Sequence, residues 1–135
     1  MVTLLQTPLI RSEYDERRRL VRYTRTSQGF SSIHELEETY KNLIQSTVRL
    51  DLRHLALLID LREAPPRNDP AFEEAIARYR GPMMQGFARV AVLVKSAVGR
   101  LQVRRHAAND GIANLVTQDE DEALRYLGVR GSGDV

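Results

Sequence analysis

The chain has 135 residues, of which 42% are apolar, and a formal net charge of +2. A chain of this length builds one hydrophobic core and leaves too little sequence for a second domain. We therefore expect a single domain over residues 1–130 and a flexible tail over residues 131–135. The small net charge argues against a nucleic-acid-binding protein, because binding to phosphates depends on a concentrated excess of cations.

Composition also bears on where the protein acts. No segment approaches the roughly 20 apolar residues that a membrane-spanning helix needs. Residues 1–6 lack the basic region and the long apolar region of a signal peptide. The sequence contains no cysteine, which excludes disulfides and thiolate metal sites and is compatible with a reducing compartment. These features predict a cytoplasmic protein that does not span a membrane.

The N-terminal segment is predicted to form a β-hairpin. Its two arms, residues 4–11 and 19–26, are rich in β-branched and aromatic residues, and the polar stretch 13–16 between them suits a turn. Three consecutive arginines at positions 17–19 are typical of an exposed sheet edge, where cations discourage pairing with another sheet.

A helix is predicted after Ser32. Ser32 and Glu35 have the spacing of a capping box, in which each side chain accepts a hydrogen bond from the other residue's backbone N–H. Apolar residues then recur at helical spacing and form one stripe, which contains Ile33, Leu36, Tyr40, Leu43 and Ile44. We expect this stripe, including Tyr40, to pack against a sheet and to have no catalytic role.

Two short apolar runs, residues 55–59 and 90–94, indicate strands that are buried on both faces. The helix between them is predicted to begin at Pro70, with Asp69 as its N-cap, and to break or kink at Gly81 and Pro82. Met83 and Met84 follow the break, and adaptable core packing explains them better than a ligand surface does.

The C-terminal part repeats the alternation of strand and helix. Ser96 is expected to cap a helix that runs to a stop at residues 109–111, and a strand follows at residues 113–116. Thr117 and Glu120 have capping-box spacing before a last amphipathic helix that contains Ala123, Leu124 and Leu127. The order β-β-α-β-α-β-α-β-α predicts one α/β domain with a mixed, mainly parallel sheet and crossover helices.

Three segments of this pattern resemble the STAS family, the fold of the sporulation anti-sigma-factor antagonists. They are the strand 57–60 ahead of a helix, the strand 87–94 and the closing helix 119–127. The resemblance covers residues 19–127 and is strongest to the SpoIIAA-like branch, which also resembles small lipid-binding SEC14 modules. It implies a regulatory or protein-interaction module.

The chain departs from the antagonists at one position. In that family the loop after the second core strand presents a phosphorylatable Ser or Thr at a helix N-terminus. Residues 60–70 of this chain contain neither Ser nor Thr. The resemblance therefore implies a module without the phosphorylation switch. Ser96 is the nearest hydroxyl by topology, and we expect it to be an N-cap and not a phosphorylation site.

No catalytic or metal-binding motif is present. His34, His54 and His106 do not have metal-ligand spacing, and the sequence has no P-loop, dinucleotide fingerprint or nucleophile elbow. We expect neither an enzyme nor a bound metal or cofactor. Pairing of edge strands or amphipathic helices makes a homodimer the expected assembly, and the sequence does not identify a protein partner.

Ligands of open α/β sheets gather outside the carboxyl ends of the strands. The polar residues expected there are Asp60, Arg62, Glu63, Arg67, Asn68, Lys95, Ser96, Arg100 and Arg104. Lys95 and the N-terminus of the helix after it supply positive potential at one point, which suits an anion. Two hypotheses follow, a non-enzymatic regulatory or protein-interaction module and, as the alternative, a protein that binds a small anionic ligand or a lipid.

Overall fold

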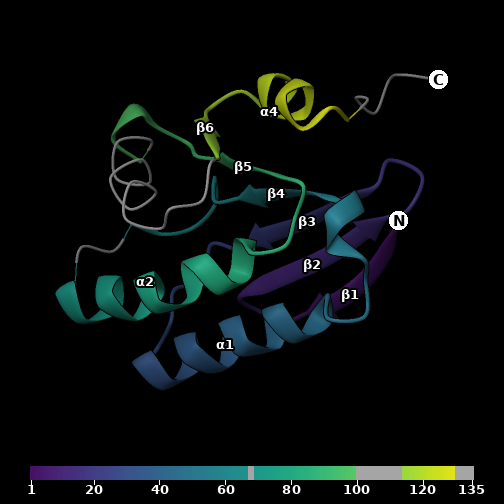
Figure 1. The fold of residues 1–135 in the computed structure, drawn as a ribbon. Helices are drawn as coiled ribbons and strands as arrows, with labels where there is room; N and C mark the ends of the chain where they lie inside the picture. Colours follow the sequence, from purple (N-terminus) through teal and green to yellow (C-terminus); the bar gives the residue numbers. More distant parts are fainter. Residues whose placement is uncertain (67–68, 100–113, 130–135) are drawn as a thin grey trace.

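The computed structural model describes residues 1–66, 69–99 and 114–129. Within these residues six strands form one sheet, whose spatial order follows the chain (Figure 1). The strands are β1 (Val2–Gln6), β2 (Ile10–Asp15), β3 (Leu20–Arg25), β4 (Ala56–Asp60), β5 (Arg89–Leu93) and β6 (Leu115–Thr117). The helices are α1 (Ile33–Ser46), η1 (Leu52–His54), α2 (Pro70–Met84) and α4 (Glu120–Leu127).

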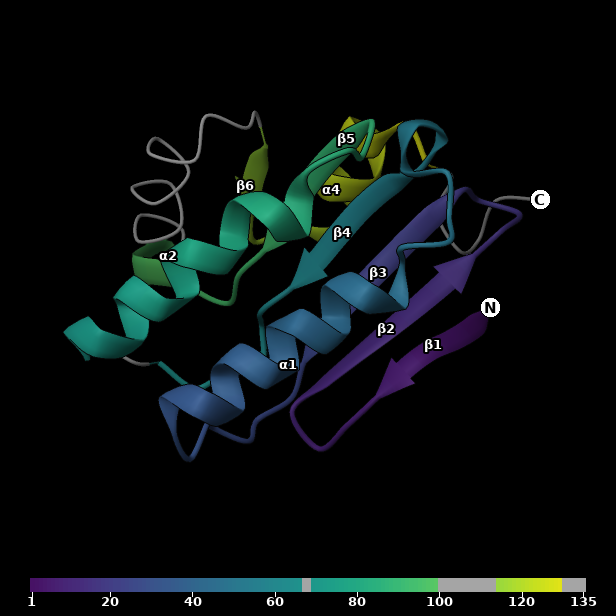
Figure 2. The ribbon, with the colours of Figure 1, turned by 60° about the horizontal axis from the view of Figure 1, so that its bottom comes forward.

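The sheet is mixed, as predicted. β1, β2 and β3 pair antiparallel, whereas β3, β4, β5 and β6 pair parallel. The crossover helices α1 and α2 cover one face of the sheet and α4 covers the other (Figures 1 and 2). Every residue of β4 is buried, which explains its continuous apolar sequence. The domain is therefore a three-layer α/β sandwich.

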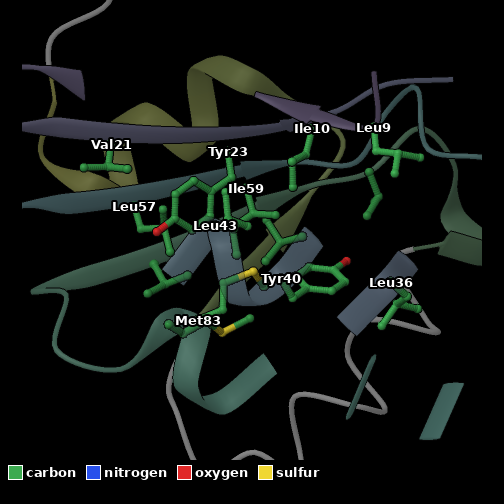
Figure 3. Packing of buried hydrophobic residues seen from close by; sticks show 14 of the residues in the cluster. Leu9, Ile10, Val21, Tyr23, Leu36, Tyr40, Leu43, Leu57, Ile59 and Met83 are labelled. Carbon is green, nitrogen blue, oxygen red and sulfur yellow. The ribbon is translucent and has the colours of Figure 1, made fainter. Parts of the chain in front are cut away.

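Alternate side chains of each central strand pack into different hydrophobic clusters, one on each face of the sheet. Leu57 and Ile59 pack into the larger cluster, under α1 and α2, whereas Leu58 packs into the smaller cluster under α4. In Figure 3, Tyr23 and Ile59 lie on the sheet side of the larger core, with the side chains of α1 and α2 across from them. The predicted stripe of α1 provides part of that core.

The predicted N-terminal hairpin is wrong in its strand count, because three strands precede α1. The first turn lies at residues 7–9, where the Thr7 hydroxyl oxygen accepts hydrogen bonds from the backbone N–H groups of Leu9 and Ile10 at 3.1 and 3.0 Å. The expected turn at 13–16 is mostly strand, since β2 continues to Asp15. The arginines at 17–19 lie in the turn between β2 and β3 and not, as predicted from the sequence, on a sheet edge. The strand at this edge of the sheet is β1.

The helix boundaries follow the capping signals with three differences. Ser32 caps α1 as predicted, but the Glu35 carboxylate accepts from the N–H of Ser31 at 2.8 Å. α2 continues through Pro82 to Met84. A proline this near the end removes only one helical hydrogen bond, and the buried Met83 and Met84 hold the last turn against the core.

The N-cap of α4 is Asp119 and not Thr117. The Asp119 carboxylate accepts a hydrogen bond from the N–H of Asp121 at 2.9 Å. Thr117 is still part of β6, and its hydroxyl oxygen accepts from the N–H of Asp119 at 3.1 Å. The threonine therefore shapes the turn that leads to the cap.

A cluster of four charged side chains joins the sheet to α4. Asp60, at the end of β4, accepts hydrogen bonds from Arg22 of β3 and from Arg62 in the following loop, both at 2.7 Å. The same Nη2 groups reach Glu120 at 2.8 and 3.1 Å. The backbone N–H of Arg62 also donates to Asp60 at 3.1 Å, which fixes the start of the loop. We call these four residues the charge cluster.

The charge cluster keeps Asp60 ionised. Burial by itself would raise the pKa of this carboxyl, but the hydrogen bonds from Arg62 and Arg22 outweigh burial and lower the pKa of Asp60 from 3.8 to about 2. The same hydrogen bond raises the pKa of Arg62. The ionised carboxylate of Asp60 thus links β3, β4 and the loop after β4.

Replacing Asp60 by asparagine should destabilise the fold. Asp60→Asn keeps the size of the side chain but leaves Arg22 and Arg62 with only Glu120 to offset their charges, so we expect a loss of about 2 kcal/mol in the free energy of unfolding. Urea denaturation measures this value. Glu38→Gln removes an exposed ion pair with Lys41 and should leave the midpoint unchanged. Equal stability of Asp60→Asn and wild type would contradict the role of the cluster.

The contribution of Asp60 should also depend on pH. Its pKa of about 2 in the folded protein lies below 3.8, so between these values the unfolded chain binds more protons and stability falls as pH falls. We expect the difference in unfolding free energy between wild type and Asp60→Asn to be constant above about pH 5 and to shrink towards pH 2. Denaturant titrations at several pH values measure it. A difference that stays constant down to pH 2 would refute the assignment.

Candidate functional site

A cavity of about 640 Å³ lies at the carboxyl ends of the central strands, between the sheet and α2. Its volume falls in the range of small-molecule pockets. Most of the described side chains that line it are apolar, among them Ile10, Ile59, Ile76, Met83, Met84 and Val92. This is the edge of the sheet where the sequence placed a ligand site.

Local structure explains why the cavity forms there. Just after β4, the N–H of Leu61 still donates to the carbonyl of Leu93 in β5 at 2.9 Å. The chain then turns, and the N–H of Ala64 donates to the carbonyl of Leu61 at 3.1 Å. Tyr40 of α1, which lines the cavity, stacks on Tyr79 of α2 with ring centroids 6.0 Å apart. The two helices are thus joined beside the cavity.

The cavity wall carries an excess of positive charge. Arg25, Arg62, Arg80 and Lys95 line it, and Glu73 is the one carboxylate among its described lining residues. Arg25 and Arg80 are only 7% and 6% exposed. Basic side chains in an otherwise apolar cavity suit a ligand that is itself partly apolar and partly anionic.

Arg25 is held by uncharged groups. Its Nε donates to the carbonyl of Leu9 at 3.2 Å and its Nη2 to the carbonyl of Gln28 at 3.1 Å. The guanidinium carbon lies 4.2 Å from the centre of the Phe30 ring. In the described part of the chain no carboxylate forms an ion pair with Arg25.

Tyr23 of β3 brings a hydroxyl group to the cavity lining. Its oxygen lies 3.3 Å from the Thr47 hydroxyl oxygen. Burial raises the pKa of Tyr23 to about 12, so the phenol stays protonated at neutral pH. Its ring therefore acts as part of the cavity wall and its hydroxyl as a hydrogen-bonding group.

The structure separates the predicted site residues into groups. Arg62, Lys95 and Ser96 line the cavity together, whereas Asp60 lies in the charge cluster on the opposite face of the sheet. Glu63 is exposed outside the cavity lining. Ser96 is the expected N-cap, since its hydroxyl oxygen accepts from the N–H of Gly99 at 3.1 Å. The remaining candidates, Arg67, Asn68, Arg100 and Arg104, lie outside the described residues, as do the predicted helix beyond residue 99 and the tail 131–135.

Arg25 and Arg80 line the cavity but are not among the residues predicted from the sequence. The alternation of β3 carried the signal, because Val21, Tyr23 and Arg25 fall on one face, and the first two belong to the larger core. Arg80 follows Ile76 by four residues on α2, which places it on the core-facing side. An inward-facing cation in either pattern would have marked the cavity.

Comparison with known proteins supports the fold. No protein-family model matches the chain, and no curated protein matches its sequence. A crystal structure of an uncharacterised protein of the DUF3478 family from Shewanella loihica PV-4, described as having a SpoIIAA-like fold, superposes with a TM-score of 0.59. The match has 15% identity and covers 87% of this chain and 91% of that one. No helix in the described ranges is long and apolar enough to cross a membrane. The chain has a SpoIIAA-like fold.

Proposed function

We propose that this chain is a non-enzymatic, STAS-like module that binds a small, largely apolar molecule in the cavity beside α2. The observation that carries the proposal is the cavity itself, about 640 Å³ in volume and lined mainly by apolar side chains. A space of this size at the carboxyl ends of parallel strands is the usual setting of a ligand site.

The ionisable groups nearby favour binding over catalysis. A general acid or base works best with a pKa near the working pH. The pKa of Asp60 is about 2, and two arginines hold its carboxylate on the face away from the cavity. The pKa of Tyr23 is about 12. Both groups therefore suit a structural role.

Filling the cavity should abolish binding. Ile76→Trp places an indole in the cavity wall, whereas Ala77→Trp places the same group at an exposed position of α2. We expect 1-decanol or decanoate to raise the melting temperature of wild type and of Ala77→Trp but not of Ile76→Trp. Differential scanning fluorimetry measures the shift, and native mass spectrometry of the purified protein tests for a copurified ligand.

Two results would overturn the proposal. One is that neither decanol nor decanoate changes the melting temperature of the wild type. The other is that Ile76→Trp responds to the probes as strongly as Ala77→Trp does, which would place their binding outside the cavity.

A protein-interaction role is the second candidate, and the outer edge of β1 favours it. In the described part of the chain no further strand pairs with this edge, and residues 1–6 include no charged side chain that would discourage pairing. Pairing of β1 with a second copy would give the homodimer expected from the sequence.

The homodimer can be tested at β1 itself. Val2→Lys adds a charge at a position that is 58% exposed, and Val48→Lys adds the same charge at a position 61% exposed outside the strand. Sedimentation velocity should find a dimer for the wild type and for Val48→Lys and a monomer for Val2→Lys. A monomeric wild type would refute pairing through β1.

A further inference from the structure

Arg25 is a buried cation that forms no ion pair with a carboxylate of the described residues. Its side chain lies at the end of β3, on the face that carries the larger core, and only 7% of the residue is exposed. Transfer of an ion from water to such a place is unfavourable unless it is paired. The contacts of Arg25 with Leu9, Gln28 and Phe30 orient the guanidinium but supply no negative charge.

Those contacts leave part of the guanidinium unused. Nε and Nη2 each donate to a backbone carbonyl, and Nη1 donates to none of the described residues. The Phe30 ring, 4.2 Å from the guanidinium carbon, restricts the plane of the group. Arg25 also lines the cavity. A fixed donor group of this kind is suited to an anion that enters the cavity.

We infer that Arg25 binds the anionic end of the cavity ligand, so that the ligand is an amphipath with a carboxylate or phosphate head and an apolar body. This inference rests on the proposed function and names the class of ligand. Ile59, Met84 and the other apolar lining residues would contact the body. A buried charge-assisted hydrogen bond gives strong discrimination against an uncharged analogue.

The position of the head differs from the one predicted by the sequence. That prediction placed an anion at Lys95, which also lines the cavity but is exposed. Water screens the charge of an exposed ammonium, so removing the ammonium group by mutation should lower the affinity for an anion only slightly. Arg25 has far less access to water, so its charge should dominate the choice of head group. Lys95→Met therefore tests the competing position of the head group, at Lys95, against Arg25→Met.

The experiment compares ligands that share one apolar chain. Isothermal titration calorimetry measures binding of decanoate, decyl phosphate and 1-decanol to the wild type, Arg25→Met and Lys95→Met. For the wild type we expect one of the anions to bind at least ~10-fold more tightly than decanol. Arg25→Met should reduce this ratio of affinities to about 1 without weakening the binding of decanol. Lys95→Met should retain most of the ratio. The anion with the larger ratio identifies the head group.

Each outcome bears on a different statement. Equal binding of decanol and both anions by the wild type, or an unchanged ratio in Arg25→Met, overturns the inference but leaves the cavity proposal intact. Failure of all three probes to bind contradicts the proposed function. Should Arg25→Met not fold, the side-chain NMR signal of Arg25 in the wild type decides. It should shift with the bound anion and not with decanol, and the absence of that difference overturns the inference.

Discussion

The carboxylate of Asp60 fixes the relative positions of three parts of the fold. It ends β4, a strand that is buried along its whole length, and it accepts hydrogen bonds from Arg22 on the neighbouring strand and from Arg62 at the start of the next loop. Both arginines also donate hydrogen bonds to Glu120 in the first turn of α4. Without these carboxylates the two guanidinium groups would repel each other. The position of α4 against the sheet and the conformation of the loop after β4 therefore depend on the ionised Asp60.

This arrangement also determines where the cavity can lie. Arg62 belongs to the charge cluster and to the cavity wall, so the residue that fixes the loop also forms one side of the cavity. Successive residues of β3 face opposite sides of the sheet. Arg22 consequently meets carboxylates on the α4 side, whereas Tyr23 and Arg25 line the cavity on the side of α1 and α2. Among the described residues, β3 thus carries a cation paired with carboxylates on one face and a cation without such a pair on the other.

The parts of the fold that the sequence predicts well are those in which local pattern and burial agree. β4 and β5 are continuous apolar runs because both of their faces are covered, and α1 follows its apolar stripe. The first strand was missed because its turn is made by the Thr7 side chain, which ordinary strand patterns do not display. The helix does not break at Pro82, because tertiary contacts of Met83 and Met84 outweigh the loss of one hydrogen bond.

Arg22 and Arg25 show why the candidate site was harder to predict than the fold. They lie three residues apart on one strand, and periodicity alone assigns them to opposite faces. What distinguishes them is their partners, which come from elsewhere in the chain: Asp60 and Glu120 stand 38 and 98 residues from Arg22. Arg25 contacts two backbone carbonyls and an aromatic ring. Such groups are too common in a protein sequence to point to Arg25. A pattern can place a cation inside a core, but only the three-dimensional arrangement of distant residues shows whether the protein itself neutralises that charge or leaves it for a ligand.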